Sequence, residues 1–250
     1  MRRLSVALLV LAAAMPAPAS AAARRTPPST VTVLRMGDSR TTGVGSSWGD
    51  GYAPELARLL GQAGIAVSYP PVAGSTGWDV QGLRSIVDAA AAASSPDVVL
   101  LAVGTNNAAG ACGSAPCAGM AGYQAAFYDL VQRILVDAPG AHLFIGEIQY
   151  SSASWAVNEV YTNAAHITAT WQPWCSARCT LVHLQGISRC GGLASDNVHP
   201  TDAGYQLMAD QWARAILDHY GLPVWPAKVQ ESGAPRPGFE VPAVRVSNGC

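Results

Sequence analysis

Four short segments of the sequence carry side chains that suit acyl transfer, and each follows a stretch of apolar residues. They are Gly37-Asp38-Ser39, Gly74-Ser75-Thr76-Gly77-Trp78, Gly104-Thr105-Asn106-Asn107 and Asp196-Asn197-Val198-His199-Pro200. A serine hydroxyl becomes a nucleophile when a nearby imidazole accepts its proton, and a carboxylate can orient that imidazole. Glycine and asparagine N–H groups can bind the oxyanion that forms during the attack. The four segments together indicate acyl transfer through a covalent serine intermediate.

The elements that must position these segments are alternating strands and helices. The expected strands are Val31–Met36, Ile65–Tyr69, Val98–Val103, His142–Ile148 and Leu181–Leu184. The expected helices are Tyr52–Gln62, Val80–Ala93, Tyr123–Asp137, Asn158–Thr170 and Thr201–His219. Five alternations predict an α/β fold, a three-layer α/β/α sandwich with a mostly parallel five-stranded sheet. Because ligands bind outside the carboxyl ends of such strands, the four segments are expected to meet at one sheet edge.

The order of the four segments resembles the four blocks of the SGNH (GDSL-type) hydrolases, over a stretch from Val31 to about His219. This resemblance implies the flavodoxin-like sandwich of that family and no metal or organic cofactor. It implies that Ser39 is the nucleophile, His199 the general base and Asp196 its orienting carboxylate. It further implies an oxyanion hole made by the backbone N–H groups of Ser39 and Gly74 and by the side chain of Asn106.

Two assignments within these blocks have rivals, and two residues depart from the family pattern. Gly77 competes with Gly74, and Asn107 with Asn106, for a place in the oxyanion hole. Arg40 stands where the family usually has leucine, and Asn107 where it usually has aspartate. A cation beside the nucleophile is expected either to attract an anionic or polar substrate or to pair with an acid, Asp38 or Asp50. The candidate substrate-binding residues are Arg40 and Asn107, together with Trp78 of the glycine loop.

The N-terminus has the pattern of a secretory signal peptide. Arg2 and Arg3 precede an apolar stretch, and small residues follow it up to Ala23. The apolar stretch is shorter than the about 20 residues that a membrane anchor needs. We expect cleavage near Ala21–Ala23 and secretion. The expected organisation is a signal peptide at 1–23, a polar lead-in at 24–30, a hydrolase domain at 31–220 and a proline-rich C-terminal wrap at 221–250.

Six cysteines in an exported chain predict disulfide bonds. Sequence spacing suggests the pairs Cys112–Cys117, Cys175–Cys179 and Cys190–Cys250, among fifteen arrangements that six cysteines allow. Cys175, Cys179 and His183 also fall at spacings that suit zinc. An oxidising compartment favours the disulfide interpretation over that metal site.

The composition of this chain of 250 residues limits the classes of partner that we expect it to bind. Only 12% of its residues are charged and its formal net charge is −1, which gives no electrostatic footprint for nucleic acid. No later apolar segment is long enough to span a bilayer, so we expect no stable membrane insertion, and we expect a monomer.

The glycine loop is similar to that of secreted carbohydrate acetyl esterases, so the expected substrate is a small-molecule ester or an acylated polysaccharide. Trp78, with Trp48 or Trp155, would then offer a face for a sugar ring. The alternatives are a lipase or phospholipase and a non-catalytic carbohydrate-binding module.

Overall fold

The computed structural model describes residues 28–109, 123–147, 178–184, 187 and 191–224. The predicted signal peptide, the predicted helix at 158–170, Trp155, nearly all of the C-terminal wrap and every cysteine except Cys179 lie outside these ranges. Those predictions stay predictions. No helix within the described ranges is both long and apolar enough to cross a membrane.

A parallel sheet forms the centre of the fold, with strands in the order β2-β1-β4-β5-β6. Its strands are β1 (Thr30–Gly37), β2 (Ala66–Ser68), β4 (Val98–Ala102), β5 (His142–Gly146) and β6 (Cys179–Val182). The five predicted strands are thus confirmed, with small shifts at their ends. A short sixth strand, β3 (Ala73–Gly74), was not predicted and also pairs with β1. Pro70 and Pro71 separate β2 from β3, because proline has no N–H to donate to a sheet.

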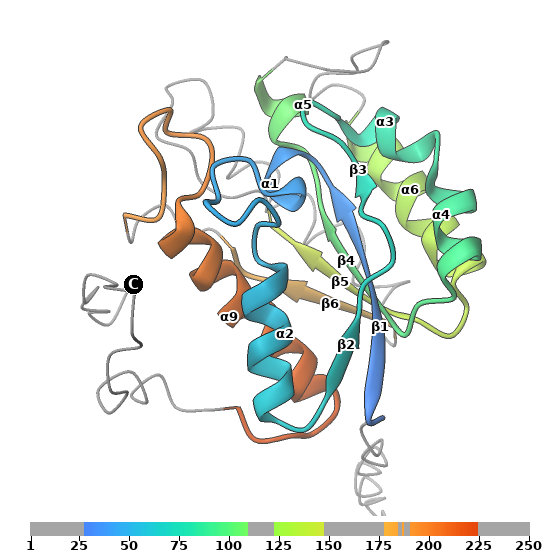
Figure 1. Ribbon diagram of the computed structural model, residues 1–250. Coiled ribbons are helices and arrows are strands. Elements are labelled where there is room, and N and C mark those ends of the chain that lie inside the picture. The colour runs from blue at the N-terminus through green and yellow to red at the C-terminus, as the bar shows by residue number, and fades with distance from the viewer. Residues whose placement is uncertain (1–27, 110–122, 148–177, 185–186, 188–190, 225–250) are drawn as a thin grey trace, which may run out of the picture.

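Helices cover both faces of the sheet, as Figure 1 shows. One face carries α2 (Ala53–Gln62) and α9 (Asp202–His219), and the other carries α3 (Val80–Arg84), α4 (Val87–Ser94) and α6 (Tyr123–Asp137). Two short helices, α1 (Ser39–Thr42) and α5 (Thr105–Ala109), follow β1 and β4 directly. The predicted three-layer α/β/α sandwich is therefore confirmed.

Alternating side chains of the central strands fill two separate cores. On β4, Val98 and Leu100 pack toward α2 and α9, whereas Val99 and Leu101 pack toward α3, α4 and α6. All four are fully buried, and burying such a side chain stabilises a fold by about 1.5 to 3 kcal/mol. A strand that is covered on both faces is apolar at every position, which explains the continuous apolar run in the sequence.

The predicted helix Val80–Ala93 is wrong in one respect, because it is two helices. Helix α3 ends at Arg84 and α4 begins at Val87, and between them the N–H of Ile86 donates to Leu83, three residues back, in place of the usual four. The hydroxyl of Ser85 donates to the carbonyl oxygen of Gly82 at 2.6 Å. Such a local bond competes with the regular helical pattern and often marks a break. Both helices contact α6.

The strand order places a topological switch point between β1 and β4. The chain goes from β1 to β2 on one side, and later returns to add β4 on the other side. In sheets of this kind, the crevice at the carboxyl ends of the two central strands is where ligands bind. Ser39 follows β1 and Asn106 follows β4, so both candidate residues flank this point.

Candidate active site

Ser39 lies at the start of α1, where the backbone leaves the sheet. Asp38 caps this helix, since its carboxylate Oδ1 accepts the backbone N–H of Arg40 at 3.0 Å. Gly43 ends the helix in the left-handed conformation, with φ at 92°. Such a short helix, fixed at both ends, holds the Ser39 side chain in one place at the sheet edge.

Asp196 and His199 lie in one compact turn that leads into α9. The Asp196 Oδ1 atom accepts the backbone N–H groups of Val198 at 2.9 Å and His199 at 3.0 Å. Asn197 takes the left-handed backbone that asparagine tolerates, with φ at 59°. Thr201 then caps α9 through its hydroxyl, which accepts the N–H of Gly204. One oxygen of Asp196 therefore organises the turn and leaves the other for the His199 side chain.

The structure joins this turn to Ser39, which lies 160 positions earlier in the chain. The His199 Nδ1 atom is 2.6 Å from Asp196 Oδ2, and its Nε2 atom is 2.9 Å from Ser39 Oγ. A carboxylate accepts only, so Nδ1–H donates to Asp196 and Nε2 accepts from the serine hydroxyl. This is the geometry that a nucleophile, a base and an orienting acid require.

Asp196 stays ionised in this arrangement. Partial burial alone would raise the pKa of its carboxyl group, but hydrogen bonds from the side chain and backbone of His199 and from the backbone of Val198 outweigh it and hold the pKa at about 2. The side chain of Asp196 is 49% exposed, whereas that of His199 is 21% exposed. Asp196 is therefore a permanent acceptor for the His199 ring at any ordinary pH.

Gly74 lies beside the last residue of β1, Gly37, which precedes Ser39 by two positions in the chain. It pairs with Gly37 in the register of β1 and β3, whereas Gly77 lies in the turn that precedes α3. The backbone of Gly74 has φ at 146°, and a Cβ atom there would lie 1.8 Å from the carbonyl oxygen of Gly37. Only glycine fits this approach, which favours Gly74 over Gly77 as the residue next to the nucleophile.

We expect Gly74→Ala to lower the free energy of unfolding by at least about 2 kcal/mol, because the new methyl group must displace backbone. Urea unfolding, followed by circular dichroism, measures this change. Gly61→Ala is the matched control, since nothing lies within 4 Å of a Cβ at that helical position. Alanine there is expected to add up to about 1 kcal/mol of stability. Equal unfolding midpoints for the two variants would refute the close approach.

The two asparagines after β4 both hold the loop between β3 and α3. The Nδ2 atom of Asn106 donates to the carbonyl oxygen of Trp78 at 2.7 Å. An amide carries two N–H groups, so this bond commits one of them and orients the other. The Oδ1 atom of Asn107 accepts the N–H of Val80 at 3.1 Å, and Asn107 is only 1% exposed. Asn106 thus remains the candidate for the oxyanion hole, and Asn107 supports the loop.

The three candidate substrate-binding residues differ in how far they face solvent. Asn107 is buried, and Arg40 is 3% exposed with its Nε atom donating to the carbonyl oxygen of Val198 at 3.1 Å. Trp78 is half-buried and packs against the core that contains α3 and α6. Arg40 and Asn107 were candidates because they depart from the family pattern, but both are buried and their described contacts are with the protein itself.

A glycine-rich loop after α1, residues 43–51, packs beside the turn that contains His199. The Tyr205 hydroxyl donates to the carbonyl oxygen of Val44 at 2.7 Å. The backbone N–H and the hydroxyl of Ser47 donate to the carboxylate of Asp202 at 2.8 and 2.7 Å. The sequence analysis did not predict this loop as part of the site. The run of glycines could have indicated it, because their positive φ angles permit the sharp bends of the loop.

Cys179 begins β6 and is disulfide-bonded. The other five cysteines lie outside the described residues, so the predicted pairing with Cys175 stays a prediction, as do the pairs Cys112–Cys117 and Cys190–Cys250. A cysteine in a disulfide offers no thiolate to zinc. His183, the third residue of the alternative zinc set, contacts the buried Glu147 instead, with Nδ1 3.1 Å from Oε1.

Comparisons with known proteins agree with this geometry. A family model described as the GDSL-like lipase/acylhydrolase family matches residues 36–207. No curated protein matches the chain. Among solved structures, a family 3 carbohydrate esterase from Clostridium thermocellum is 24% identical, with a TM-score of 0.61, and the match covers 77% of this chain and 98% of that one.

Two further solved structures share the fold. A variant of an acetyl xylan esterase from Geobacillus stearothermophilus is 21% identical, with a TM-score of 0.57, over 82% of this chain and 100% of its own. A lipase from a goat rumen metagenome is 14% identical, with a TM-score of 0.59, over 73% of this chain and 95% of its own. Identities this low establish the likeness of fold.

Proposed function

The chain belongs to the GDSL-like lipase/acylhydrolase family and is a hydrolase, and from this premise we propose that it is a secreted serine esterase that removes short acyl groups, acetyl above all, through a covalent acyl-serine intermediate. The observation that carries the proposal is the continuous chain of hydrogen bonds from Ser39 through His199 to Asp196. In this proposal Ser39 is the nucleophile, His199 is the general base and Asp196 orients the His199 ring.

In the first half of the reaction, the Oγ atom of Ser39 attacks the carbonyl carbon of the ester. The hydroxyl proton passes to Nε2 of His199, which lies 2.9 Å away. The oxyanion that forms is bound by the N–H groups of Ser39 and Gly74 and by the amide of Asn106; each such donor is worth about 3 to 4 kcal/mol in the transition state. The alcohol then leaves with the proton from Nε2, and the acyl group remains on Ser39.

In the second half, water replaces the alcohol. His199 takes a proton from the water, whose oxygen attacks the acyl carbon, and the same proton returns to Ser39 Oγ as the carboxylic acid leaves. In both halves the positive charge that forms on the imidazole lies next to the ionised Asp196, 2.6 Å from Nδ1. Asp196 therefore stabilises the charge without accepting the proton.

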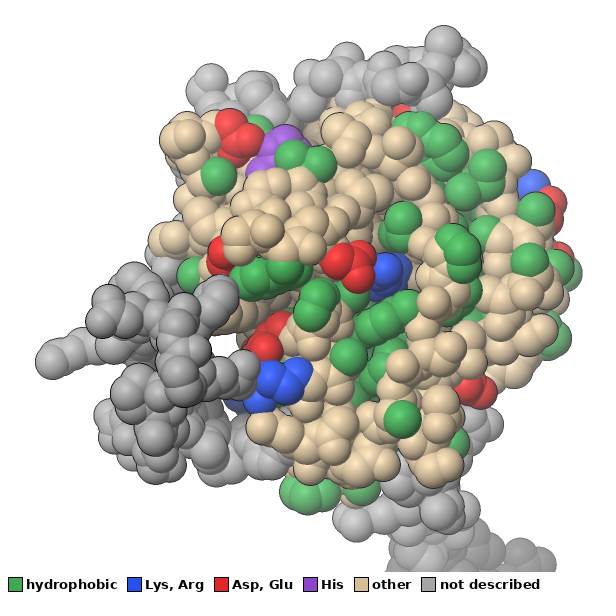
Figure 2. Space-filling view, in the orientation of Figure 1, with side chains coloured by type: hydrophobic (Ala, Val, Ile, Leu, Met, Phe, Trp, Pro, Cys, Tyr) green, Lys and Arg blue, Asp and Glu red, His purple; other side chains and the backbone are tan. Residues whose placement is uncertain are grey.

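Two observations support an acylated sugar as substrate. Only 12% of the residues of the chain are charged, and Figure 2 shows charged side chains scattered among uncharged ones over the described part of this face, which suits a neutral polar substrate. Similar folds include enzymes described as a carbohydrate esterase and an acetyl xylan esterase. The half-buried Trp78, beside Asn106, is the residue within the described ranges that we propose as a stacking face for a sugar ring.

We expect p-nitrophenyl acetate to be hydrolysed with a larger kcat/KM than p-nitrophenyl octanoate, and acetate to be released from acetylated xylan. Initial rates, followed by absorbance, measure the hydrolysis of the two p-nitrophenyl esters, and an enzymatic assay measures the acetate released from xylan. The mature chain, without residues 1–23, is the form to use. A preference for the octanoate ester, with no acetate released from xylan, would indicate the lipase alternative instead. No hydrolysis of either ester by the folded protein would overturn the esterase proposal.

A further inference from the structure

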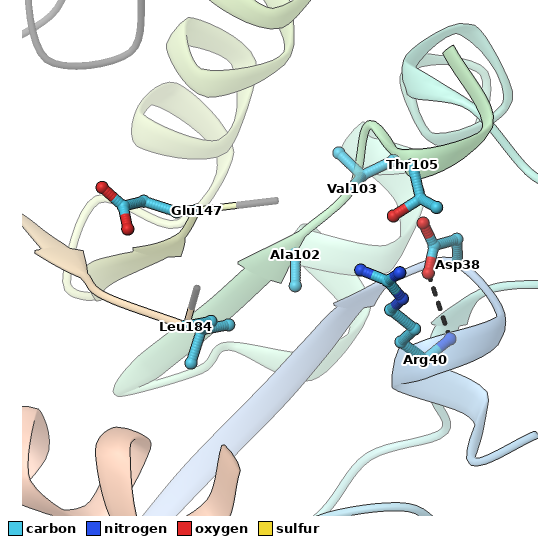
Figure 3. A pocket seen from close by; sticks show the side chains of 7 residues that line it. All are labelled: Asp38, Arg40, Ala102, Val103, Thr105, Glu147 and Leu184. Carbon is cyan, nitrogen blue, oxygen red and sulfur yellow. Dashed lines mark hydrogen bonds between the residues drawn. The ribbon is translucent and has the colours of Figure 1, made fainter. Parts of the chain in front are cut away.

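Arg40 is a buried cation between the two parts of the candidate active site. It is the second residue of α1, next to Ser39, and its side chain crosses the carboxyl end of the sheet toward Ala102 (Figure 3). The residue is 3% exposed and lines a small hollow together with Asp38, Thr105 and Glu147. A guanidinium that is removed from water in this way needs partners in the protein.

Its hydrogen bond to Val198 fixes the peptide group that precedes His199. The Nε atom of Arg40 donates to the carbonyl oxygen of Val198 at 3.1 Å. The N–H of His199, which belongs to the same planar peptide group, donates to Asp196 at 3.0 Å. Both ends of this one peptide group are therefore held, and the direction in which the His199 side chain leaves the backbone is set.

The charge of Arg40 lies between two carboxylates of the site. Burial lowers the pKa of Arg40, while attraction to the carboxylates of Asp38 and Asp196 opposes that effect. Burial likewise raises the pKa of Asp38, and attraction to Arg40 opposes it. Asp38 caps the helix of Ser39, whereas Asp196 orients His199. One cation thus interacts with the acid that supports the nucleophile and with the acid that supports the base.

We propose that Arg40 is a positioning residue that couples the helix of Ser39 to the turn of His199, so that nucleophile and base keep their hydrogen bond during the reaction. The inference rests on the esterase reaction proposed above. Asp50, the other acid that was expected to pair with Arg40, instead contacts Arg35, with Nη1 2.6 Å from Oδ1. Because Arg40 is buried, its effect falls on kcat rather than on substrate binding.

The test uses Arg40→Ala and Arg40→Lys in the mature protein, with p-nitrophenyl acetate as substrate. We expect Arg40→Ala to lower kcat by about 10- to 100-fold, because small displacements of catalytic groups have effects of this size. KM is expected to stay within about twofold, since no substrate contact is lost. Arg40→Lys keeps the charge beside Asp38 but not the planar donor, and should lie between Arg40→Ala and the wild-type protein.

Chemical rescue separates positioning from a general loss of stability. Guanidinium chloride, below the concentrations that unfold the protein, should restore part of the kcat of Arg40→Ala, because the ion fits the space of the missing side chain. Sodium chloride at equal ionic strength should not. Arg35→Met is the matched control: it also removes a buried, ion-paired arginine, so it should lower thermal stability yet leave kcat within about twofold of wild type.

The inference is overturned if either folded Arg40 variant keeps the wild-type kcat, if only KM changes, or if guanidinium restores nothing to Arg40→Ala. Should Arg40→Ala fail to fold, Arg40→Lys decides, because a wild-type kcat in that folded variant would contradict the need for the planar donor. An inactive wild-type protein would overturn the esterase proposal and this inference together. Active wild-type protein with unaffected variants would overturn this inference alone.

Discussion

Ser39→Ala is expected to lower kcat for p-nitrophenyl acetate by about 10⁴- to 10⁶-fold, the range over which loss of a catalytic serine acts. Alanine removes the Oγ atom that we propose forms the acyl intermediate, while the base and its acid stay in place. The substitution should leave the fold intact, because the Ser39 hydroxyl makes its described bond to His199 alone and α1 is held by Asp38 and Gly43. Initial rates and circular dichroism check the two expectations.

Ser94→Ala is the control for this variant. Ser94 lies at the end of α4, where its hydroxyl donates to the carbonyl oxygen of Ala90 at 2.7 Å, far along the chain from the site. Its loss should leave kcat unchanged. If Ser39→Ala kept more than about one hundredth of the wild-type kcat, the nucleophile would have to be another residue.

Asp196→Asn is expected to lower kcat by about 10³- to 10⁴-fold without unfolding the turn. Asparagine keeps an oxygen for the backbone N–H groups of Val198 and His199, so the local structure survives. Its amide N–H₂, however, donates to Nδ1 of His199 and forces the ring proton to Nε2. That nitrogen can then no longer accept the proton of Ser39.

The rates of Asp196→Asn and of Asp210→Asn measure this effect against a matched change. Asp210 lies on α9 and pairs with Arg214 at 2.6 Å, outside the site. Its substitution should leave kcat within about twofold of wild type. Equal rates for the two variants would show that the Nδ1 contact does not set the state of the His199 ring.

The pKa of Asp196 gives a second view of the same contact. Its value of about 2 lies below the ordinary 3.8, so the folded state favours the ionised carboxylate. The stability that this provides is complete above about pH 4 and is lost as the pH falls toward 2. Protonation of Asp196 therefore does not limit activity at any pH where the enzyme is ordinarily assayed.

The strands and long helices were predictable because their burial leaves a direct pattern in the sequence. Val98–Ala102 is covered on both faces and is apolar throughout, and Tyr123–Asp137 was predicted with both ends correct. Elements that depend on one local bond were not predictable in this way. The break at Ser85 and the two-residue strand at Gly74 leave no periodic signal, since each arises from contacts made by single residues.

The order of the motifs in the sequence predicted which residues form the site, but the sequence did not predict the surroundings of each side chain. The sequence pointed to Ser39, Asp196 and His199, and the structure brings their side chains within hydrogen-bonding distance. It did not reveal that Arg40 reaches Val198, because the two residues are 158 positions apart and the acceptor is a backbone oxygen. A carbonyl oxygen is present at every position, so no residue type marks it as a partner.

The central claim is that Ser39 forms a covalent bond to the acyl group, and labelling with a fluorophosphonate tests it most directly. The reagent reacts with a serine that an adjacent histidine activates, and its phosphorus then takes the place of the acyl carbon. Mass spectrometry of the digested protein should find one label, on the peptide that contains Ser39, and none in Ser39→Ala. Active wild-type protein that stays unlabelled, or that carries its label on another residue, would contradict the account.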